Sequence, residues 1–379
     1  MKRRSKLLAI LILVFLFSIQ GYSQDKTAPH NGPPPEKTVE QVKKNIKVLT
    51  GMPASQFNSV MDYFTASLGV GCDHCHASDA SGHIQFESDE KDAKKTAREM
   101  ITMVKALNED HFNGKLSVTC YTCHRGSTEP MRMPQLPIAA RPKEDEHGPE
   151  HAKLPKIEDL LSAYENALGG ADAIAKIKTR VTKAILTRDG NELPLEMTQM
   201  APDRYAGTMT VEGRGDFTNV YNGHDVWSVM KDGSRPLPET ERIRLSREAP
   251  MFPLQHMRDL GEMLQLRGTD TVNGKSAYVL FARIGDNIME RYYIDSATSL
   301  LIRRNVLNKT MLSWIPDQCD YEDYRTVDGV KIPFVMRYSY VNSRNNSIHR
   351  FTDVKQNVAV DEKLFAMPEM KAPDMRERR

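Results

Sequence analysis

The spacing of apolar residues predicts helices in the first part of the chain. Between residues 54 and 112 apolar side chains recur every three or four positions, which places them on one face of a helix. The first stripe consists of Phe57, Val60, Met61, Phe64 and Leu68. The second consists of Ala93, Ala97, Met100, Val104 and Leu107. We expect the second helix to begin at Ser88, a residue type that favours the N-cap.

The second part of the chain has a different pattern, typical of strands. After one helical segment at 156–178, short stretches rich in β-branched and aromatic residues follow at 179–188, 195–202, 204–211, 217–230, 275–284, 290–306 and 332–341. Asp-Gly or Asn-Gly pairs, which favour hairpin turns, stand at 189–190, 222–223, 232–233, 273–274 and 328–329. A further helix is predicted at 253–264. The fold class is therefore α + β, with a mainly helical domain followed by a curved antiparallel sheet that carries helices on its concave side.

The N-terminus has the layout of a secretory signal peptide. Four cations at positions 2, 3, 4 and 6 precede an apolar run at 7–19, and small and polar residues follow. We predict a signal peptide at 1–23, cleaved after Ser23, and hence an exported, periplasmic protein. The run is shorter than the ~20 residues of a membrane span. An uncleaved anchor, with association at the membrane, is the alternative.

The ~355 residues that remain exceed what one hydrophobic core usually organises, so two domains are expected. We predict a linker at 24–45, a first domain at 46–130, a linker at 131–154, a second domain at 155–370 and a charged tail at 371–379. The second linker is rich in proline and charge, and we expect its His147 and His151 to be solvated. Removing the four signal-peptide cations from the net charge of +2 leaves about −2. This charge does not indicate a nucleic-acid partner.

Two Cys-x-x-Cys-His pentads carry the candidate chemistry. The first is formed by Cys72, Cys75 and His76, and the second by Cys120, Cys123 and His124. Zinc sites and redox dithiols also use paired cysteines. Covalent c-type haem needs both thiols of a pentad for the porphyrin and the following histidine for the iron. Because both copies have that histidine, we predict two haem c groups, with His76 and His124 as proximal ligands. The fifth cysteine, Cys319, is expected to be a half-buried free thiol on a strand.

The sixth ligand of each iron is sought on the helix that precedes each pentad. Met61 lies on the apolar face of the first helix, and Met100 and Met103 both point roughly inward on the second. A methionine on an apolar face is equally often a flexible core residue. Spacing alone leaves the choice among these residues open.

Residues 46–130 resemble one repeat unit of the tetrahaem cytochrome subunit of photosynthetic reaction centres. The resemblance rests on "NIKVLTGMPASQFNSVMDYFTASLGVGCDHCH", "FESDEKDAKKTAREMITMVKALN" and "VTCYTCHRG" in that order. It implies that Met61 and Met100 are the distal iron ligands, with Met103 a neighbour that does not bind. The chain departs from the family in having two pentads instead of four. His83 and His111 are the alternative distal ligands, while His74 is expected to be solvated.

The second domain resembles, less specifically, the half-barrel of outer-membrane lipoprotein carriers. The resemblance rests on "ALGGADAIAKIKT", "RYYIDSATSLLIRR" and "YEDYRTVDGVKIPFVMRYS". It implies a concave face that binds a hydrophobic or lipid ligand; the alternative is a docking module for the haem domain.

These observations predict an electron-transfer protein and not an enzyme. An iron with two protein ligands is closed to substrate, so single-electron transfer between an unidentified donor and acceptor protein is expected. Two alternatives remain: a sheet domain whose ligand the haems sense or oxidise, and a haem peroxidase if one iron is five-coordinate.

Overall fold

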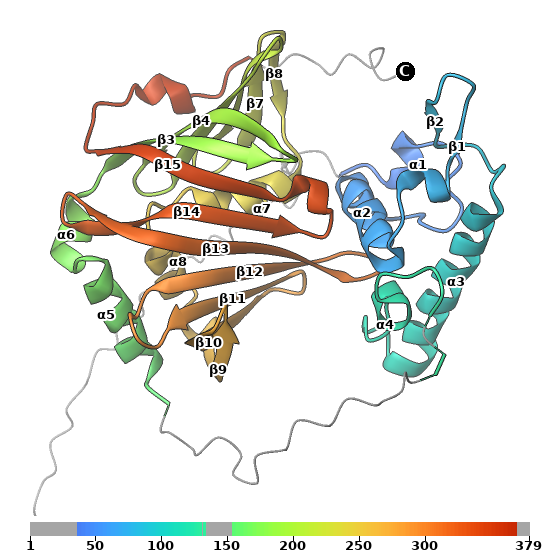
Figure 1. Ribbon diagram of the computed structural model, residues 1–379, viewed down its shortest axis with the longest axis horizontal. Helices are drawn as coiled ribbons and strands as arrows, with labels where there is room; N and C mark the ends of the chain where they lie inside the picture. The colour runs from blue at the N-terminus through green and yellow to red at the C-terminus, as the bar shows by residue number, and fades with distance from the viewer. Residues whose placement is uncertain (1–35, 131, 134–153, 370–379) are drawn as a thin grey trace, which may run out of the picture. The chain divides into compact units, whose positions relative to one another are not determined.

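The structure, a computed structural model, describes residues 36–130, 132–133 and 154–369 (Figure 1). The predicted signal peptide, most of the 131–154 linker with its two histidines, and the charged tail lie outside these residues. The residues from Lys37 onward cluster into one compact unit. Helical and sheet-forming segments follow one another along this unit in the predicted order.

The first part of the unit is mainly helical. Its elements are α1 (Val39–Val42), the 3₁₀ helix η1 (Ala54–Gln56), α2 (Phe57–Leu68), the 3₁₀ helix η2 (Cys72–His74), β1 (Ala77–Ser78), β2 (Ile84–Gln85), α3 (Asp92–Phe112) and α4 (Cys120–His124). Helix α1 falls within the segment expected to be a linker, and its Val39 is fully buried.

Local sequence explains where the two long helices end. Gly69, with φ of 67°, follows α2, and its amide donates to the carbonyl of Thr65 at 2.8 Å. Asn113, with φ of 53°, closes α3 in the same left-handed conformation. Glycine and asparagine are the residues that adopt this conformation most readily. The predicted start of α3 is wrong: its N-cap is Lys91, because Ser88 instead accepts a hydrogen bond from the amide of Glu90 in the preceding turn.

The second part of the unit is one sheet with helices. After α5 (Ile157–Leu168) and α6 (Ala171–Lys176) come β3 (Thr179–Arg188), β4 (Asn191–Met200), β5 (Arg204–Val211), β6 (Gly215–Tyr221), β7 (Val226–Met230), β8 (Gly233–Pro236), α7 (Glu239–Glu248), α8 (Pro253–Asp259), η3 (Gly261–Met263), β9 (Leu264–Val272), β10 (Lys275–Ile284), β11 (Ile288–Asp295), β12 (Leu301–Lys309), β13 (Trp314–Val327), β14 (Val330–Tyr340), η4 (Ser343–Asn345), β15 (Ser347–Gln356) and η5 (Glu362–Phe365).

The thirteen strands form an open antiparallel sheet in the order β8-β7-β6-β5-β4-β3-β15-β14-β13-β12-β11-β10-β9. Strand β15 closes the meander by pairing with β3. All five predicted hairpin turns are present, and both residues of three of them have positive φ, as at Asp189 and Gly190. That backbone conformation matches the twist of a tight hairpin.

The core lies between the sheet and the helices α5, α7 and α8, and Figure 1 shows α7 and α8 against one face of the sheet. Tyr164 of α5 and Met257 of α8 pack with strands β10–β14, and Leu245 of α7 packs with strands β3–β7. These three side chains are nearly or completely buried. The predicted fold class is confirmed. The sequence pattern missed α7, a second helix on that face.

Candidate haem sites

The first pentad forms a single tight turn. Gly71 precedes the 3₁₀ helix η2, and the amides of Cys75 and His76 both donate to the carbonyl of Cys72, at 3.3 and 3.1 Å. The two thiols and the imidazole are therefore presented by one turn of backbone. Covalent attachment of one porphyrin requires this grouping.

The second pentad is a short helix, α4, with a capping box at its start. The amide of Thr119 donates to the hydroxyl of Thr122 at 3.0 Å. In return, the hydroxyl of Thr119 accepts a hydrogen bond from the amide of Thr122. Cys120 and Cys123 then lie three residues apart on one side of the helix, with His124 next to them.

The surroundings of the two histidines predicted to be proximal ligands fit neutral imidazoles. In His124, Nδ1–H donates to the carbonyl of Ser127 at 2.9 Å, which leaves the Nε2 lone pair available. The ring of His76 packs edge-on against Phe86 at 5.1 Å between centroids. Two effects chiefly lower the pKa of His76: burial, which is the larger, and the nearby positive charge of Lys94. Both favour the neutral imidazole that iron requires.

The four cysteines of the pentads form no disulfide in the structure. All five cysteines are free, and burial raises the pKa of Cys75 and of Cys120. Zinc binding and dithiol exchange both use thiolates, which a lowered pKa would favour. Among the described residues, no three His, Cys, Asp or Glu side chains are grouped as a metal site.

The methionines differ in their surroundings. Met61 is partly buried and packs against the apolar cluster of the helical region, whereas the side chain of Met100 is 37% exposed on α3. Met103, Phe86 and Tyr121 are also large exposed apolar residues of this region. Exposed apolar surface of this kind is typical of a binding site. The donors and the surface around both pentads thus fit a flat hydrophobic group such as haem.

The other candidates in this region are at the surface. His74, His83 and His111 are exposed, and Nδ1 of His83 hydrogen-bonds the hydroxyl of Ser81 at 2.8 Å.

Helix α2 holds the two pentads together, which the sequence did not reveal. The amide of Gly126, just after the second pentad, donates to the carbonyl of Ser67 at 2.8 Å. The amide of Tyr121, inside that pentad, donates to the hydroxyl of Tyr63 at 3.3 Å. Tyr63 and Ser67 are both buried on the face of α2 that meets α4. One helix therefore carries the candidate distal ligand of the first pentad and supports the second.

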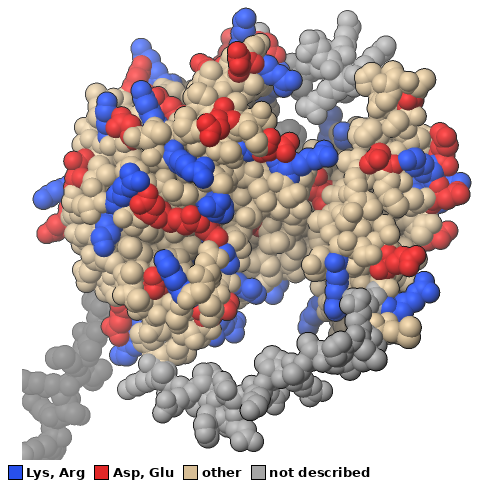
Figure 2. All heavy atoms as spheres, viewed as in Figure 1, with Lys and Arg blue, Asp and Glu red and all other residues tan. Residues whose placement is uncertain are grey.

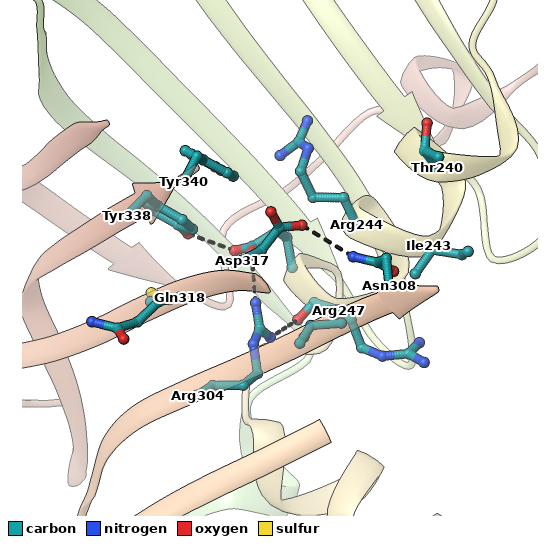
Figure 3. A pocket seen from close by; sticks show the side chains of 13 residues that line it. Thr240, Ile243, Arg244, Arg247, Arg304, Asn308, Asp317, Gln318, Tyr338 and Tyr340 are labelled. Carbon is teal, nitrogen blue, oxygen red and sulfur yellow. Dashed lines mark hydrogen bonds and ion pairs between the residues drawn. The ribbon is translucent and has the colours of Figure 1, made fainter. Parts of the chain in front are cut away.

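Two small cavities lie between the sheet and the helices that cover it. One of about 40 Å³ lies beside α7, and a second of about 70 Å³ lies between α5, α8 and the sheet. Figure 3 shows the first, where Arg304 donates to the carbonyl of Arg247 at 2.9 Å and Asn308 donates to Asp317 at 3.2 Å. Such volumes accommodate a few water molecules. Cys319, on β13 at the first cavity, is fully buried and not half-buried, and burial raises the pKa of its thiol.

Comparison with known proteins supports the cytochrome resemblance. Residues 18–151 match the family model described as photosynthetic reaction centre cytochrome C subunit. The first third of the chain resembles this family. The reaction centre cytochrome c subunit of Roseobacter denitrificans is 31% identical over 117 residues, which are 29% of this chain and 30% of that protein. Cytochrome c-554 of Chloroflexus aurantiacus is 34% identical over 90 residues, 22% of this chain and 20% of that protein. The chain thus spans less than a third of the length of these relatives.

The sheet region has similar solved structures. A LolA superfamily protein from Nitrosomonas europaea aligns at 13% identity with a TM-score of 0.41, covering 56% of this chain and 99% of that one.

The surface has no strong charge pattern on the face that Figure 2 shows. Figure 2 shows acidic and basic side chains interspersed over the visible face, without a large patch of one sign. No helix among the residues that the structure describes has both the length and the apolar character of a membrane span.

Gly69→Ala is expected to destabilise the helical region that contains α1 to α4. A Cβ at this position would lie 2.2 Å from the carbonyl oxygen of Gly126, and φ of 67° is unfavourable for alanine. The matched control is Gly51→Ala, where φ is 79° and nothing lies within 4 Å of the new Cβ. We expect the control to cost about 1–2 kcal/mol of unfolding free energy, and Gly69→Ala to cost roughly 1–3 kcal/mol more from the clash. Denaturant unfolding of both variants measures the difference, and equal costs would contradict the close approach of the two pentads.

Proposed function

We propose that this protein is an exported c-type cytochrome that carries single electrons through two covalently bound haems. The observation that carries the proposal is the pair of pentads, each presenting two thiols and one imidazole from a single turn. The similarity to reaction centre cytochrome c subunits supports the same conclusion. The signal-peptide pattern supports a periplasmic location.

Each side chain has one role in this proposal. The thiols of Cys72 and Cys75 hold the first haem, and those of Cys120 and Cys123 hold the second. Each S–H adds across a vinyl group, so the hydrogen stays on the porphyrin substituent and no oxidant is consumed. When bound, each haem supplies an iron that cycles between the ferrous and ferric states.

The axial ligands decide which chemistry is available. His76 and His124 would bind the two irons through Nε2 as proximal ligands, and Met61 and Met100 would bind them through sulfur as distal ligands. A thioether is a soft, neutral ligand that favours ferrous iron and raises the potential. With a histidine and a methionine on each iron, substrate would have no coordination position, and the haems would supply outer-sphere electron transfer to a redox protein.

The sheet region is proposed to position the haem domain and not to carry a lipid. Cavities of about 40 and 70 Å³ do not favour the alternative in which an acyl chain occupies the concave face. Charged groups that line the first cavity have partners within the protein, as Arg304 has in Glu248 at 2.8 Å.

The mass of the denatured mature protein tests the haem number. We expect it to exceed the polypeptide by twice the mass of one haem, because thioether bonds survive denaturation. The double variant Cys72→Ser, Cys75→Ser should retain one haem. Cys319→Ser, which changes a buried thiol outside both pentads, should retain two.

Three outcomes would contradict the proposal. A polypeptide without added mass would leave zinc or dithiol chemistry for the pentads. A single haem would remove one of the two sites. High-spin ferric iron that binds cyanide rapidly and turns over peroxide would favour the peroxidase alternative.

A further inference from the structure

The tip of the β12–β13 hairpin is buried, although hairpin tips are usually exposed to solvent. The tip consists of residues 310–313. Leu312 is 2% exposed, and Thr310 and Ser313 are buried beside it. The hydroxyl of Thr310 donates to the carbonyl of Ser313 at 2.8 Å, which closes the turn. An apolar residue at the end of a tight turn is buried only if another element covers it.

The covering element is the helical region that carries the pentads. Leu312 belongs to the same buried apolar cluster as Val60 of α2 and Ile101 of α3. Met311 and Met61 are both partly buried and pack against this cluster. The sheet region therefore contributes two side chains to the apolar core behind the candidate distal ligand of the first haem.

Two hydrogen bonds hold the same part of α2. The side-chain oxygen of Gln56 accepts from the amide of Met311 at 3.2 Å. The carboxylate of Asp62 accepts from the side-chain amide of Asn342 at 2.9 Å. Gln56 precedes Met61 by five residues and Asp62 follows it directly, so the two bonds lie on either side of Met61 along the chain.

The second pentad is supported differently. Met100 is exposed on α3, and the side chains of that helix bond within the helical region: Arg98 donates to the carbonyl of Asn45 at 3.1 Å, and Asn108 donates to the carbonyl of Val118 at 2.7 Å. Ile101 of α3 also lies in the cluster with Leu312, but its neighbour Met100 is exposed. The two hydrogen bonds from the sheet region go to residues on either side of Met61, so these contacts favour the first site over the second.

We propose that the β12–β13 hairpin tip is a positioning element of the first haem site. It holds the first half of α2 and thereby fixes Met61 as an axial ligand. In this way the sheet region sets the ligation and potential of one haem and leaves the other unchanged. This inference rests on the dihaem function proposed above.

The physical reason is that groups outside the coordination shell determine how a ligand is presented to the metal. Leu312 acts on the iron only through the placement of α2, so it is a positioning residue. Removing its side chain leaves a void in the cluster next to Met61, into which the helix can relax. A thioether that moves away from the iron makes a weaker bond, and the ferric state is then less disfavoured.

Leu312→Ala tests this inference in the mature holoprotein. We expect one of the two midpoint potentials to fall in an optical redox titration, the other to stay unchanged, and up to half of the far-red sulfur-to-iron absorption to be lost. The matched control is Leu300→Ala, which removes the same atoms from a buried position in the core of the sheet region. The control should lower thermal stability and leave both potentials unchanged.

Three further variants keep the test decisive. Asn342→Ala removes the bond to Asp62, together with the bond that the side chain of Asn342 accepts from the amide of Arg344 at the start of η4. It should shift the same midpoint by less than Leu312→Ala does. In a Met61→Ala background, Leu312→Ala should have no further effect on the midpoint, because the residue through which it acts is absent. Met311→Leu keeps the apolar contact and should leave the spectrum unchanged.

Specific results would overturn the inference. Equal shifts of both haems, or equal effects of Leu312→Ala and Leu300→Ala, would assign the hairpin a general stabilising role. Unchanged potentials in Leu312→Ala and Asn342→Ala, or loss of the far-red band in Met311→Leu, would also contradict it. Failure of the dihaem function itself would appear in the parent protein, as a wrong mass or a wrong number of midpoints, before any variant is made.

Discussion

Replacing Met61 with alanine is expected to abolish the sulfur-to-iron band of one haem and to lower its midpoint potential by roughly a tenth of a volt or more, within the ~0.8 V range that axial ligands cover. The thioether stabilises ferrous iron, and water or a histidine in its place stabilises it less. Met100→Ala should have the same effect on the other haem. The double variant should lose the band entirely. Optical redox titration of the mature protein measures both the band and the potentials.

The control for this prediction is Met103→Ala. Met103 lies on α3 close to Met100 and is exposed, as Met100 is, so both variants remove a surface thioether from one helix. An unchanged spectrum is expected for Met103→Ala. If Met103→Ala loses the sulfur-to-iron band of one haem while Met100→Ala keeps both bands, the assignment of Met100 as the distal ligand is wrong. If neither Met61→Ala nor Met100→Ala changes the spectrum, His83 and His111 are the residues to examine next.

Local sequence chemistry predicted the hairpins of the sheet, but not all of its elements. The Asp-Gly pair at 328–329 requires positive φ at both residues, and the structure has it between β13 and β14. The sequence placed Cys319 on a strand but did not predict the extent of that strand, β13, because it contains Pro316 and several acidic residues. Its Asp320 is buried and pairs with Arg303 on the neighbouring strand β12. Local spacing along the sequence does not reveal this partner.

Helix α7 was missed for a related reason. Its sequence, "ETERIRLSRE", is mostly charged, with Leu245 as the single fully buried apolar side chain. Its place on the sheet depends on Leu245, on Arg247, which pairs with Glu290 of β11, and on Glu248, which pairs with Arg304 of β12. Those contacts are not local in sequence.

In the candidate sites, too, local patterns could be predicted from the sequence and contacts between distant residues could not. A pentad is a local pattern, so its cysteines and histidine could be named from the sequence alone. Helical spacing placed Met61, Met100 and Met103 on helix faces but could not choose among them, because the face of a helix does not identify what covers it. The contact of Gly126 with Ser67 and the insertion of Leu312 join residues about 60 and 250 positions apart, and no period along the chain indicates them.

A buried carboxylate joins α7 and α8 to the sheet. The side chain of Glu290, on β11, is fully buried and accepts hydrogen bonds from Arg247 of α7, from the hydroxyl of Tyr292 and, at 2.8 Å, from Nε2 of His256 of α8. Both helices of the concave face therefore depend on one charge. A buried ion pair is costly to form, and breaking it by removing one partner leaves the other charge unpaired.

Glu290→Gln is expected to lower the free energy of unfolding by about 3–5 kcal/mol at neutral pH, the range for a buried pair that loses one partner. Denaturant unfolding followed by circular dichroism measures the loss. The matched control is Glu239→Gln, which removes an exposed carboxylate paired with Arg242 on α7. The control should cost only about 0–1 kcal/mol. Similar losses for the two variants would show that Glu290 is not a structural charge.

The pH dependence of the same variant provides a second measurement. Burial acts to raise the pKa of Glu290, but the hydrogen bond from His256 and the charge of Arg247 outweigh it and lower the pKa to about 2, from an ordinary value of 4.5. Between these two values the unfolded chain binds more protons at this site than the folded chain does, so stability falls as pH falls. Above pH 4.5 the contribution of the carboxylate is complete, and it is lost progressively towards pH 2. The difference in unfolding free energy between the parent and Glu290→Gln should therefore shrink over that interval, and a difference that stays constant with pH would mean that the carboxylate is not held in its charged form.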